Sequence, residues 1–172
     1  MPELIAPTAA LHAAWLAAHR EWGPGTHEDG FGLRAGDEVT SAAGFAAWVR
    51  RLAAESGQCT YRWIVEDGQL LGAIALRHGT DGAVLRAGHI GYGVRPSARG
   101  RGVASWALAR MLTVARERGM GRVLLVCADG NAASARTIER AGGVLESVRD
   151  TELGPARRYW IALDRRGGRA AP

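Results

Sequence analysis

The segment between residues 94 and 104, VRPSARGRGVA, constrains the fold of this chain most strongly. A strand-like stretch ends there, and a loop containing Gly100 and Gly102 runs directly into an amphipathic helix. The first turn of a helix has backbone N–H groups without partners, and the helix dipole adds partial positive charge. The glycines allow a diphosphate to approach the backbone, and Arg99 and Arg101 add charge. The segment therefore predicts a strand–loop–helix unit that binds an anion.

The rest of the chain predicts an α/β (α+β) domain in the order ααβββαβαββ. We expect helices near residues 9–20, 41–55, 103–118 and 131–142. We expect strands near residues 61–66, 70–76, 87–94, 122–127, 144–148 and 158–163, with a tight turn at Asp67-Gly68. The result is a mixed central sheet of six to seven strands flanked by about four helices. Residues 1–172 form one domain, in which 165–172 is a flexible tail.

Charge is divided unevenly along the chain. All 22 cationic side chains are arginine, and the formal net charge is +5. Residues 1–94 have a net charge of −3, whereas residues 95–172 have a net charge of +8. The basic half suits a phosphate-bearing small molecule better than nucleic acid, because few aromatic residues accompany its arginines. The lack of lysine excludes a GxxxxGK[ST] phosphate loop, and no GxGxxG follows a first strand.

Several other classes of protein are disfavoured by simpler features. Cys59 and Cys127 lie in apolar runs without a CxxC or a Cys/His cluster, so we expect neither a metal site nor a disulfide. The N-terminus has no cationic leader, and the longest apolar run is far too short to span a bilayer. We therefore expect a cytoplasmic protein that binds neither a membrane nor nucleic acid, as a monomer or a homodimer.

Three segments together resemble one family. Residues 99–104 (RGRGVA) resemble the acyl-CoA pyrophosphate loop [QR]-x-x-G-x-[GA] of the GNAT superfamily of N-acetyltransferases, and residues 89–96 (HIGYGVRP) resemble its fourth strand. Residues 131–143 (NAASARTIERAGG) are similar to its helix N-x-x-[AS]-x-x-x-[YI]-E-x-x-G-[FG]. The element order also matches, and the resemblance covers roughly residues 3–164.

The resemblance implies acetyl transfer from acetyl-CoA to a primary amine, by direct attack in a ternary complex and without a metal. The fourth strand would pair with the pantetheine, the loop amides would hold the pyrophosphate, and Asn131 and Ser134 would lie near the thiol. The cofactor-binding residues implied are Tyr92, Val94, Arg95, Arg99, Gly100, Arg101, Gly102, Val103, Ala104, Asn131 and Ser134. A non-catalytic CoA-binding module of the same fold is an alternative.

The family pattern leaves the proton donor open. Many members carry a tyrosine where this chain has Ile138, and that tyrosine is proposed to protonate the departing thiolate. We expect Ser134 to take this role, with Tyr92 and Tyr159 as alternatives.

The general base is open as well. Family members often place a glutamate where this chain has His89, and an imidazole can deprotonate an ammonium through water. His89 is therefore the first candidate for the base, and Glu66 on the neighbouring hairpin is the second.

The acceptor is suggested by an acid-rich loop. Glu28, Asp29, Asp37 and Glu38 fall where the family's acceptor-covering segment lies, and Trp22 could line a pocket beside them. Trp22, Glu28 and Asp29 are thus candidate substrate-binding residues. Such a loop favours a small polyamine-like or antibiotic amine; the alternative acceptor is a peptide or protein N-terminus.

Overall fold

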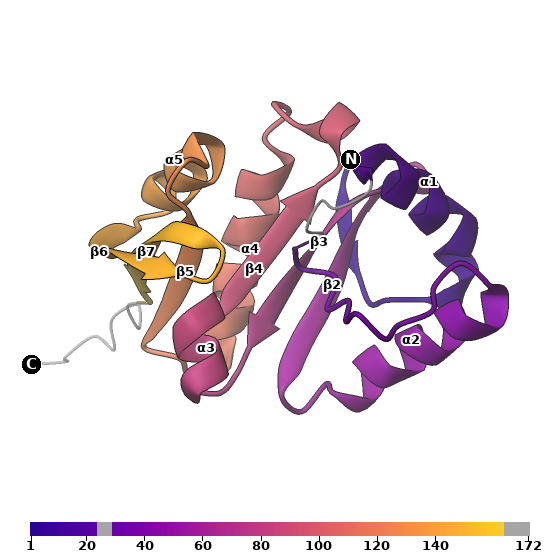
Figure 1. Ribbon diagram of the computed structural model, residues 1–172, viewed down its shortest axis with the longest axis horizontal. Coiled ribbons are helices and arrows are strands. Elements are labelled where there is room, and N and C mark those ends of the chain that lie inside the picture. The colour runs from indigo at the N-terminus through magenta and orange to yellow at the C-terminus, as the bar shows by residue number, and fades with distance from the viewer. Residues whose placement is uncertain (24–28, 164–172) are drawn as a thin grey trace, which may run out of the picture.

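The computed structural model describes residues 1–23 and 29–163. Its centre is a seven-stranded mixed sheet with the strand order β1-β2-β3-β4-β5-β7-β6 (Figure 1). The strands are β1 (Glu3–Ile5), β2 (Cys59–Glu66), β3 (Gln69–Arg77), β4 (Ile90–Val94), β5 (Arg122–Ala128), β6 (Val144–Thr151) and β7 (Gly154–Ala162). Only the β4–β5 pair is parallel; all other neighbours run antiparallel. The predicted mixed sheet is therefore confirmed.

In the described part of the chain, five α-helices and two short 3₁₀ segments accompany the sheet. They are α1 (His12–Trp22), α2 (Ala42–Ala54), α3 (Gly82–Ala87), α4 (Val103–Glu117) and α5 (Ala132–Arg140), with η1 (Ala9–Leu11) and η2 (Pro96–Ala98). Helices α1 and α2 bury their aromatic faces on one side of β2 and β3. Helices α4 and α5 build a second core on the opposite face of the sheet. The sheet is thus covered on different faces at its two halves (Figure 1).

Local sequence signals explain where several elements begin and turn. Asp67 and Gly68 both have positive φ, at 50° and 74°, which is the geometry of a tight hairpin turn. Helix α2 is capped by Ser41, whose Oγ accepts a hydrogen bond from the Gly44 amide at 3.1 Å. Asn131 caps α5 in the same way, through the Ser134 amide. The turn agrees with the sequence prediction, and the two caps place the starts of α2 and α5 within one residue of the expected positions.

The predicted strand over residues 87–94 was wrong in its first half. Residues Gly82–Ala87 form α3, and the strand is confined to β4. The Asp81 side chain accepts a hydrogen bond from the Val84 amide at 3.0 Å and so starts the helix. Gly88 ends it with a φ of 84°. The element order therefore contains one more helix than expected, and also the short strand β1, which the prediction lacked.

The pairing of β4 with β5 is short. It consists of Ile90 opposite Leu125, preceded by an isolated bridge between Gly88 and the same leucine. Beyond that point the two strands separate, which leaves the β5-facing edge of Gly91 to Val94 without a strand partner. The sheet therefore opens at its centre, towards the carboxyl ends of β4 and β5.

Two expectations concern the chain as a whole. Within the described residues, no helix combines the length and apolar character needed to cross a membrane. The predicted flexible tail, residues 165–172, lies outside the described residues.

Candidate active site

The start of α4 has the geometry of a phosphate site. Gly102 is its N-cap residue in the left-handed conformation, with φ 77°, and no side chain caps the helix. Gly100 also has a positive φ, at 75°. A Cβ atom built on either glycine would meet no atom within 4 Å, so the space above both is open. Unpaired helix N–H groups that face open space fit a diphosphate.

The preceding loop is held in place by polar contacts. Nε of Arg99 donates a hydrogen bond to the Val94 carbonyl at 2.9 Å. Glu21 of α1 accepts a hydrogen bond from Nε of Arg95 at 2.6 Å and another from Oγ of Ser97 at 3.0 Å. Burial acts to raise the pKa of Glu21, but these donors outweigh it and the pKa is lowered. Glu21 is a positioning residue that the sequence did not reveal, because nothing in α1 connects it with residue 97.

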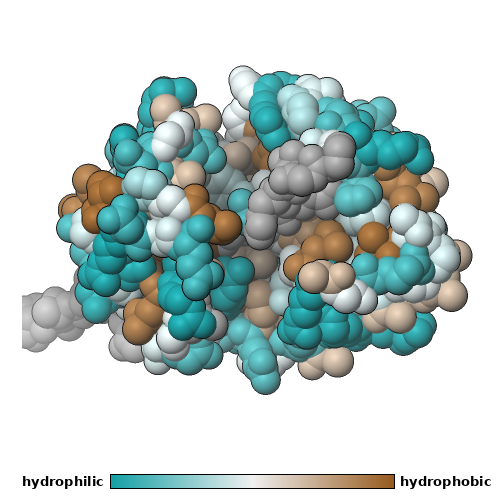
Figure 2. Space-filling model, in the orientation of Figure 1, coloured by the Kyte–Doolittle hydropathy of each residue, from teal (hydrophilic) through white to brown (hydrophobic). Residues whose placement is uncertain are grey.

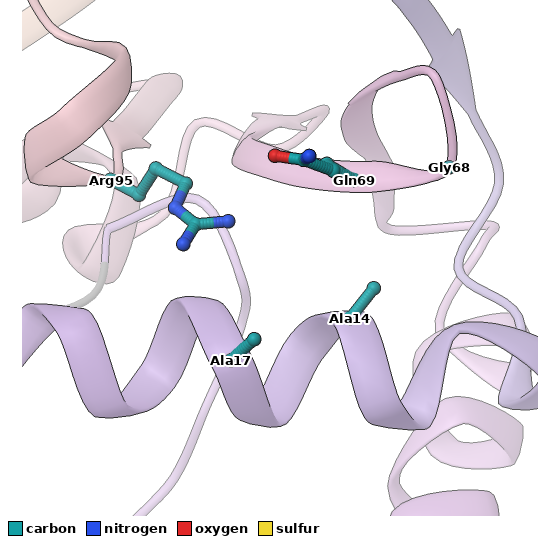
Figure 3. Close-up of a pocket in the computed structure, with 5 residues that line it drawn as sticks. All are labelled: Ala14, Ala17, Gly68, Gln69 and Arg95. Carbon is teal, nitrogen blue, oxygen red and sulfur yellow. The ribbon is translucent and has the colours of Figure 1, made fainter.

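Two cavities adjoin this loop. One, of about 490 Å³, lies between α1 and the β2–β3 hairpin, and Figure 3 shows the Arg95 side chain reaching over it towards α1. Its other lining residues are Ala14, Ala17, Gly68 and Gln69. The second, of about 470 Å³, is a groove between α4 and α5 that begins at Ser105, in the first turn of α4. This groove gives a long nucleotide-linked ligand room beyond the loop.

Two hydroxyl groups meet beside the opening between β4 and β5. The hydroxyl of Tyr92 lies 2.9 Å from Oγ of Ser134, and either atom can donate the hydrogen bond. Oδ1 of Asn131 accepts a hydrogen bond from the Ser134 amide at 3.0 Å, which fixes the serine at the start of α5. Burial raises the pKa of Tyr92 to about 12, so this phenol keeps its proton at neutral pH. The structure thus brings three predicted site residues together.

The other candidates for the proton donor lie elsewhere. Tyr159 is buried in the α4–α5 core, and its hydroxyl donates to Oε1 of Glu139 at 2.9 Å. Ile138 is buried in the same core, as an apolar side chain requires. Cys127 is buried too, and burial raises the pKa of its thiol, which fits a core residue rather than a nucleophile.

His89 lies where β4 and β5 are still joined, before the opening begins. It is 4% exposed, and its Nδ1 accepts a hydrogen bond from the Leu124 amide at 2.9 Å. Burial, with the nearby charges of Arg77 and Arg122, lowers its pKa. The neutral ring therefore carries its proton on Nε2 and has no lone pair left for a substrate. These contacts speak against the predicted role of His89 as the base.

Glu66 lies at the β2–β3 turn, at the diphosphate end of the site. Its carboxylate pairs with Arg101 and lies 3.7 Å from the N-terminal ammonium. The hydrogen bond from Arg101 lowers its pKa. The geometry therefore gives Glu66 a role in holding Arg101 and does not bring it to the Tyr92–Ser134 pair.

The acids of the acid-rich loop have different surroundings in the structure. Asp37 accepts a hydrogen bond from Arg51 at 2.6 Å, and Glu38 binds the amides and hydroxyls at the start of α2. The charge of Asp29 acts on the Tyr92 hydroxyl and contributes to its raised pKa. Glu28 lies outside the described residues.

Trp22 packs against the face of β4 instead of lining an open pocket. It is buried, and its ring forms an edge contact with Phe31 at 5.7 Å. A Cβ atom on Gly93 would come within 3.2 Å of that ring and 2.8 Å of the Asp29 carbonyl oxygen. Gly93 thus lets Trp22 of α1 and the Asp29 backbone approach the strand beside the opening.

A helix start whose geometry fits a diphosphate, next to a strand with a free edge and a hydroxyl pair, is the arrangement expected of an acyl-CoA-dependent transferase. Residues 6–144 match the family model described as the acetyltransferase (GNAT) domain. The chain therefore belongs to the GNAT family and is a GNAT-type N-acetyltransferase that uses acetyl-CoA. Among the described residues, no group of His, Cys, Asp and Glu side chains could hold a metal ion.

Solved structures show the same fold at low sequence identity. An acetyltransferase from Salmonella typhimurium that modifies the N-terminal serine of ribosomal protein L7/L12 is 19% identical, with 95% of each chain covered and a TM-score of 0.72. RimJ from Mycobacterium smegmatis, in complex with CoA-disulfide, is 20% identical, with 94% of this chain and 81% of that chain covered and a TM-score of 0.76.

A third structure, ribosomal-protein-S5-alanine acetyltransferase from Vibrio fischeri, is 14% identical, with 95% and 94% covered and a TM-score of 0.75. In the comparison with curated proteins, no sequence matches this chain.

Proposed function

We propose that this transferase acetylates the α-amine at the N-terminus of a peptide or protein. The alternative acceptor expected from the sequence thus takes precedence over the small polyamine-like or antibiotic amine. Two of the structures described above belong to enzymes that act on ribosomal proteins, one of them at an N-terminal serine. At this level of identity they support the proposal only through the shared fold, and the main support comes from the site itself.

The observation that carries the proposal is that both predicted bases have other partners. Nδ1 of His89 is occupied by the Leu124 amide, and Glu66 is paired with Arg101. An α-amine has a pKa near ~8 and a lysine side chain one near ~10.4, so only the α-amine is substantially neutral near pH 7.5 without strong assistance. A site whose predicted bases have other partners suits an acceptor that deprotonates easily.

The acidic loop supports the same acceptor. Asp37 and Glu38, which favoured a polycation, form ion pairs and helix caps within the protein. Asp29 is the acid of the described loop whose charge acts on Tyr92. A polyamine carries several ammonium groups, so its binding site needs several carboxylates along its length.

In this proposal each residue has a defined task. Amides at the start of α4 hold the diphosphate, and Gly100 and Gly102 leave space for it. Asp29 attracts the acceptor ammonium to the opening, and the α-amine, with a pKa near ~8, loses its proton to solvent before it attacks. The hydroxyl pair of Tyr92 and Ser134 passes a proton towards the thiol end of the cofactor. When bound, acetyl-CoA supplies the acetyl group and leaves as the free thiol.

The proposal is tested by measuring CoA thiol release with a panel of acceptors. The panel contains peptides with free and with blocked N-termini, polyamines and aminoglycoside amines, each at saturating acetyl-CoA. We expect the highest kcat/KM with peptides whose N-terminus is free and no turnover with the blocked ones. Higher kcat/KM with polyamines or aminoglycosides would overturn the proposal. A cytoplasmic location and the monomeric or homodimeric state stay predictions.

A further inference from the structure

A row of residues crosses the sheet on the face opposite α4, and it can be found from its chain neighbours. On the α4 face, the side chains of Leu76, Ile90, Leu125 and Tyr159 all point into the α4–α5 core. Because side chains alternate along a strand, their chain neighbours face the other way. Those neighbours are Arg77 and Ala75 of β3, Gly91 of β4, Val126 of β5 and Arg158 of β7. Figure 2 shows this side of the molecule hollowed between the half that carries β6 and β7 and the half that carries α1 and α2.

Gly91 gives this row an open centre directly beside Tyr92. A Cβ atom on Gly91 would meet only a guanidinium nitrogen of Arg77 at 3.7 Å and the Gly30 amide at 3.9 Å. Both are ordinary van der Waals distances, so the protein leaves room for a side chain that Gly91 lacks. Gly93, two residues further on, is covered by the Asp29 backbone and by Trp22. The Tyr92 side chain itself faces the α4–α5 side of the sheet. An acceptor that approaches the opening between β4 and β5 from the Gly91 face therefore passes over Gly91.

Arg77 brings a positive charge to this place. One of its terminal nitrogens donates a hydrogen bond to the Gly88 carbonyl at 3.0 Å. Within residues 1–23 and 29–163, no carboxylate lies at ion-pair distance from Arg77. The side chain is only half-buried, so a ligand in the groove can reach it.

Two other arginines of the protein differ from Arg77 in this respect. Arg158, on the same face, donates through Nε to Oε2 of Glu146 at 2.9 Å. Arg51 of α2 pairs with Asp37 and Glu55. Both are matched by acids of the protein itself, whereas the partner of the Arg77 guanidinium within the described residues is a backbone carbonyl. A planar guanidinium with unused donors is suited to binding a carboxylate.

From this geometry we propose that Arg77 is a specificity-determining residue, which selects acceptors that carry a carboxylate one or two residues after the N-terminal amine. The ammonium lies at Asp29 and Tyr92, the chain crosses Gly91, and the acidic side chain meets Arg77. The inference rests on the proposed N-terminal acetylation and names its substrate class. It also reverses the charge expected from the acid-rich loop, since the groove adds a positive group to the acceptor side.

The test compares kcat/KM for matched peptides with a free N-terminus. One pair carries Asp or Asn at the second position, and another carries Asp or Asn at the third. For the wild-type enzyme we expect at least about a tenfold preference for the acidic member of one pair. In Arg77→Gln this ratio falls to near one, because the acidic peptide loses activity while the neutral peptide keeps it. A merely structural defect would lower both peptides equally.

Three further variants test whether the preference depends on the charge of Arg77 and on the space above Gly91. Arg77→Lys keeps the charge and should retain most of the preference. Arg86→Gln removes an exposed charge on the nearby α3 and should leave the ratio unchanged. Gly91→Val places a side chain in the groove, so it should lower kcat/KM for both peptides while acetyl-CoA still raises the melting temperature.

The outcomes separate the two proposals. Equal activity on acidic and neutral peptides, or a ratio that survives in Arg77→Gln, would refute the role of Arg77 and leave N-terminal acetylation standing. Absence of activity on every peptide would refute the proposed function, and the inference about Arg77 would fall with it.

Discussion

At the scale of single residues, the site depends on a pair of hydroxyl groups that come from opposite sides of an opening in the sheet. Tyr92 belongs to β4 and Ser134 to α5, and they are 42 positions apart in the chain. The serine is held by the Asn131 cap, and the phenol is kept protonated by burial. The hydrogen bond between the two hydroxyls joins these two groups, so a proton can pass from one to the other.

This coupling predicts non-additive kinetics. Ser134→Ala and Tyr92→Phe should each lower kcat by about 10²-fold if the pair delivers a proton to the leaving thiol. The double variant should be little worse than the more damaged single variant, because both changes interrupt one proton route. Steady-state rates at saturating acetyl-CoA measure this effect. Thr113→Ala, which removes an exposed hydroxyl on α4, is the control. Losses that simply multiply would mean that the two hydroxyls act independently.

His89 illustrates a residue whose type suggested chemistry but whose contacts are structural. In His89→Ala the buried Leu124 amide loses its acceptor, which should lower the free energy of unfolding by about 1–3 kcal/mol at pH 7.5. Because the folded pKa is lowered, this contribution is present above pH ~6.5 and is lost as the pH falls towards the folded pKa. Urea unfolding should therefore show a smaller difference between wild type and variant at pH 5.5 than at pH 7.5.

The kinetics of the same variant address the predicted role of base. In the wild type we expect kcat/KM to rise with pH to a plateau above ~8, the range in which an acceptor α-amine loses its proton. The folded His89→Ala enzyme should keep this profile. If the rise with pH disappears in His89→Ala, the imidazole is the base after all.

At the scale of elements, the unit from β4 through the loop to α4 was predictable from sequence because its signals are local. Pro96, the glycines and the apolar spacing of α4 lie within a few residues of one another. The helix α3 was missed because it is only six residues long, so it has too few turns to show a helical pattern; its Asp81 cap and Gly88 stop are seen only in the structure. The place of Glu21 could not be predicted, since it depends on how α1 packs beside the loop.

The loop prediction can be tested with a matched pair of glycines. Gly102→Glu should abolish the rise in melting temperature that acetyl-CoA causes, because it places a negative side chain in the proposed phosphate site. Gly119→Glu is the control: its φ is also 77° and its Cβ direction is also open, but it lies beyond the other end of α4. Both variants carry the same backbone strain and the same charge. An equal loss of the thermal shift in both would contradict the placement of the cofactor.

The contact between α1 and the loop gives a prediction of its own. Glu21→Gln removes the charge that holds Arg95 and Ser97, so the loop loses part of its preformed shape. We expect the KM for acetyl-CoA to rise by about tenfold, with a smaller change in kcat. Glu117→Gln, an exposed acid at the end of α4, should leave both constants unchanged. An unchanged KM in Glu21→Gln would show that the loop keeps its shape without α1.

At the scale of the whole molecule, the charge division along the sequence corresponds to two faces of the site. The basic half contains the loop and helix start proposed to hold the diphosphate. The acidic half contains Asp29, whose charge acts on Tyr92. It also contains acids that pair with arginines of the protein, namely Glu21, Asp37, Glu55 and Glu66. Composition could indicate an anionic cofactor. It could not show that Asp37 and Glu38 are engaged, or that no carboxylate of the described residues pairs with Arg77, because those facts depend on the folded arrangement of the chain.

The central claim is that the acceptor is an N-terminal α-amine. It is tested most directly by mass spectrometry of one peptide that contains both a free N-terminus and an internal lysine, after incubation with the enzyme and acetyl-CoA. We predict a single added acetyl group, located on the N-terminal residue by fragmentation. Acetylation confined to the lysine side chain, or an unmodified peptide under conditions where polyamines are acetylated, would contradict the claim.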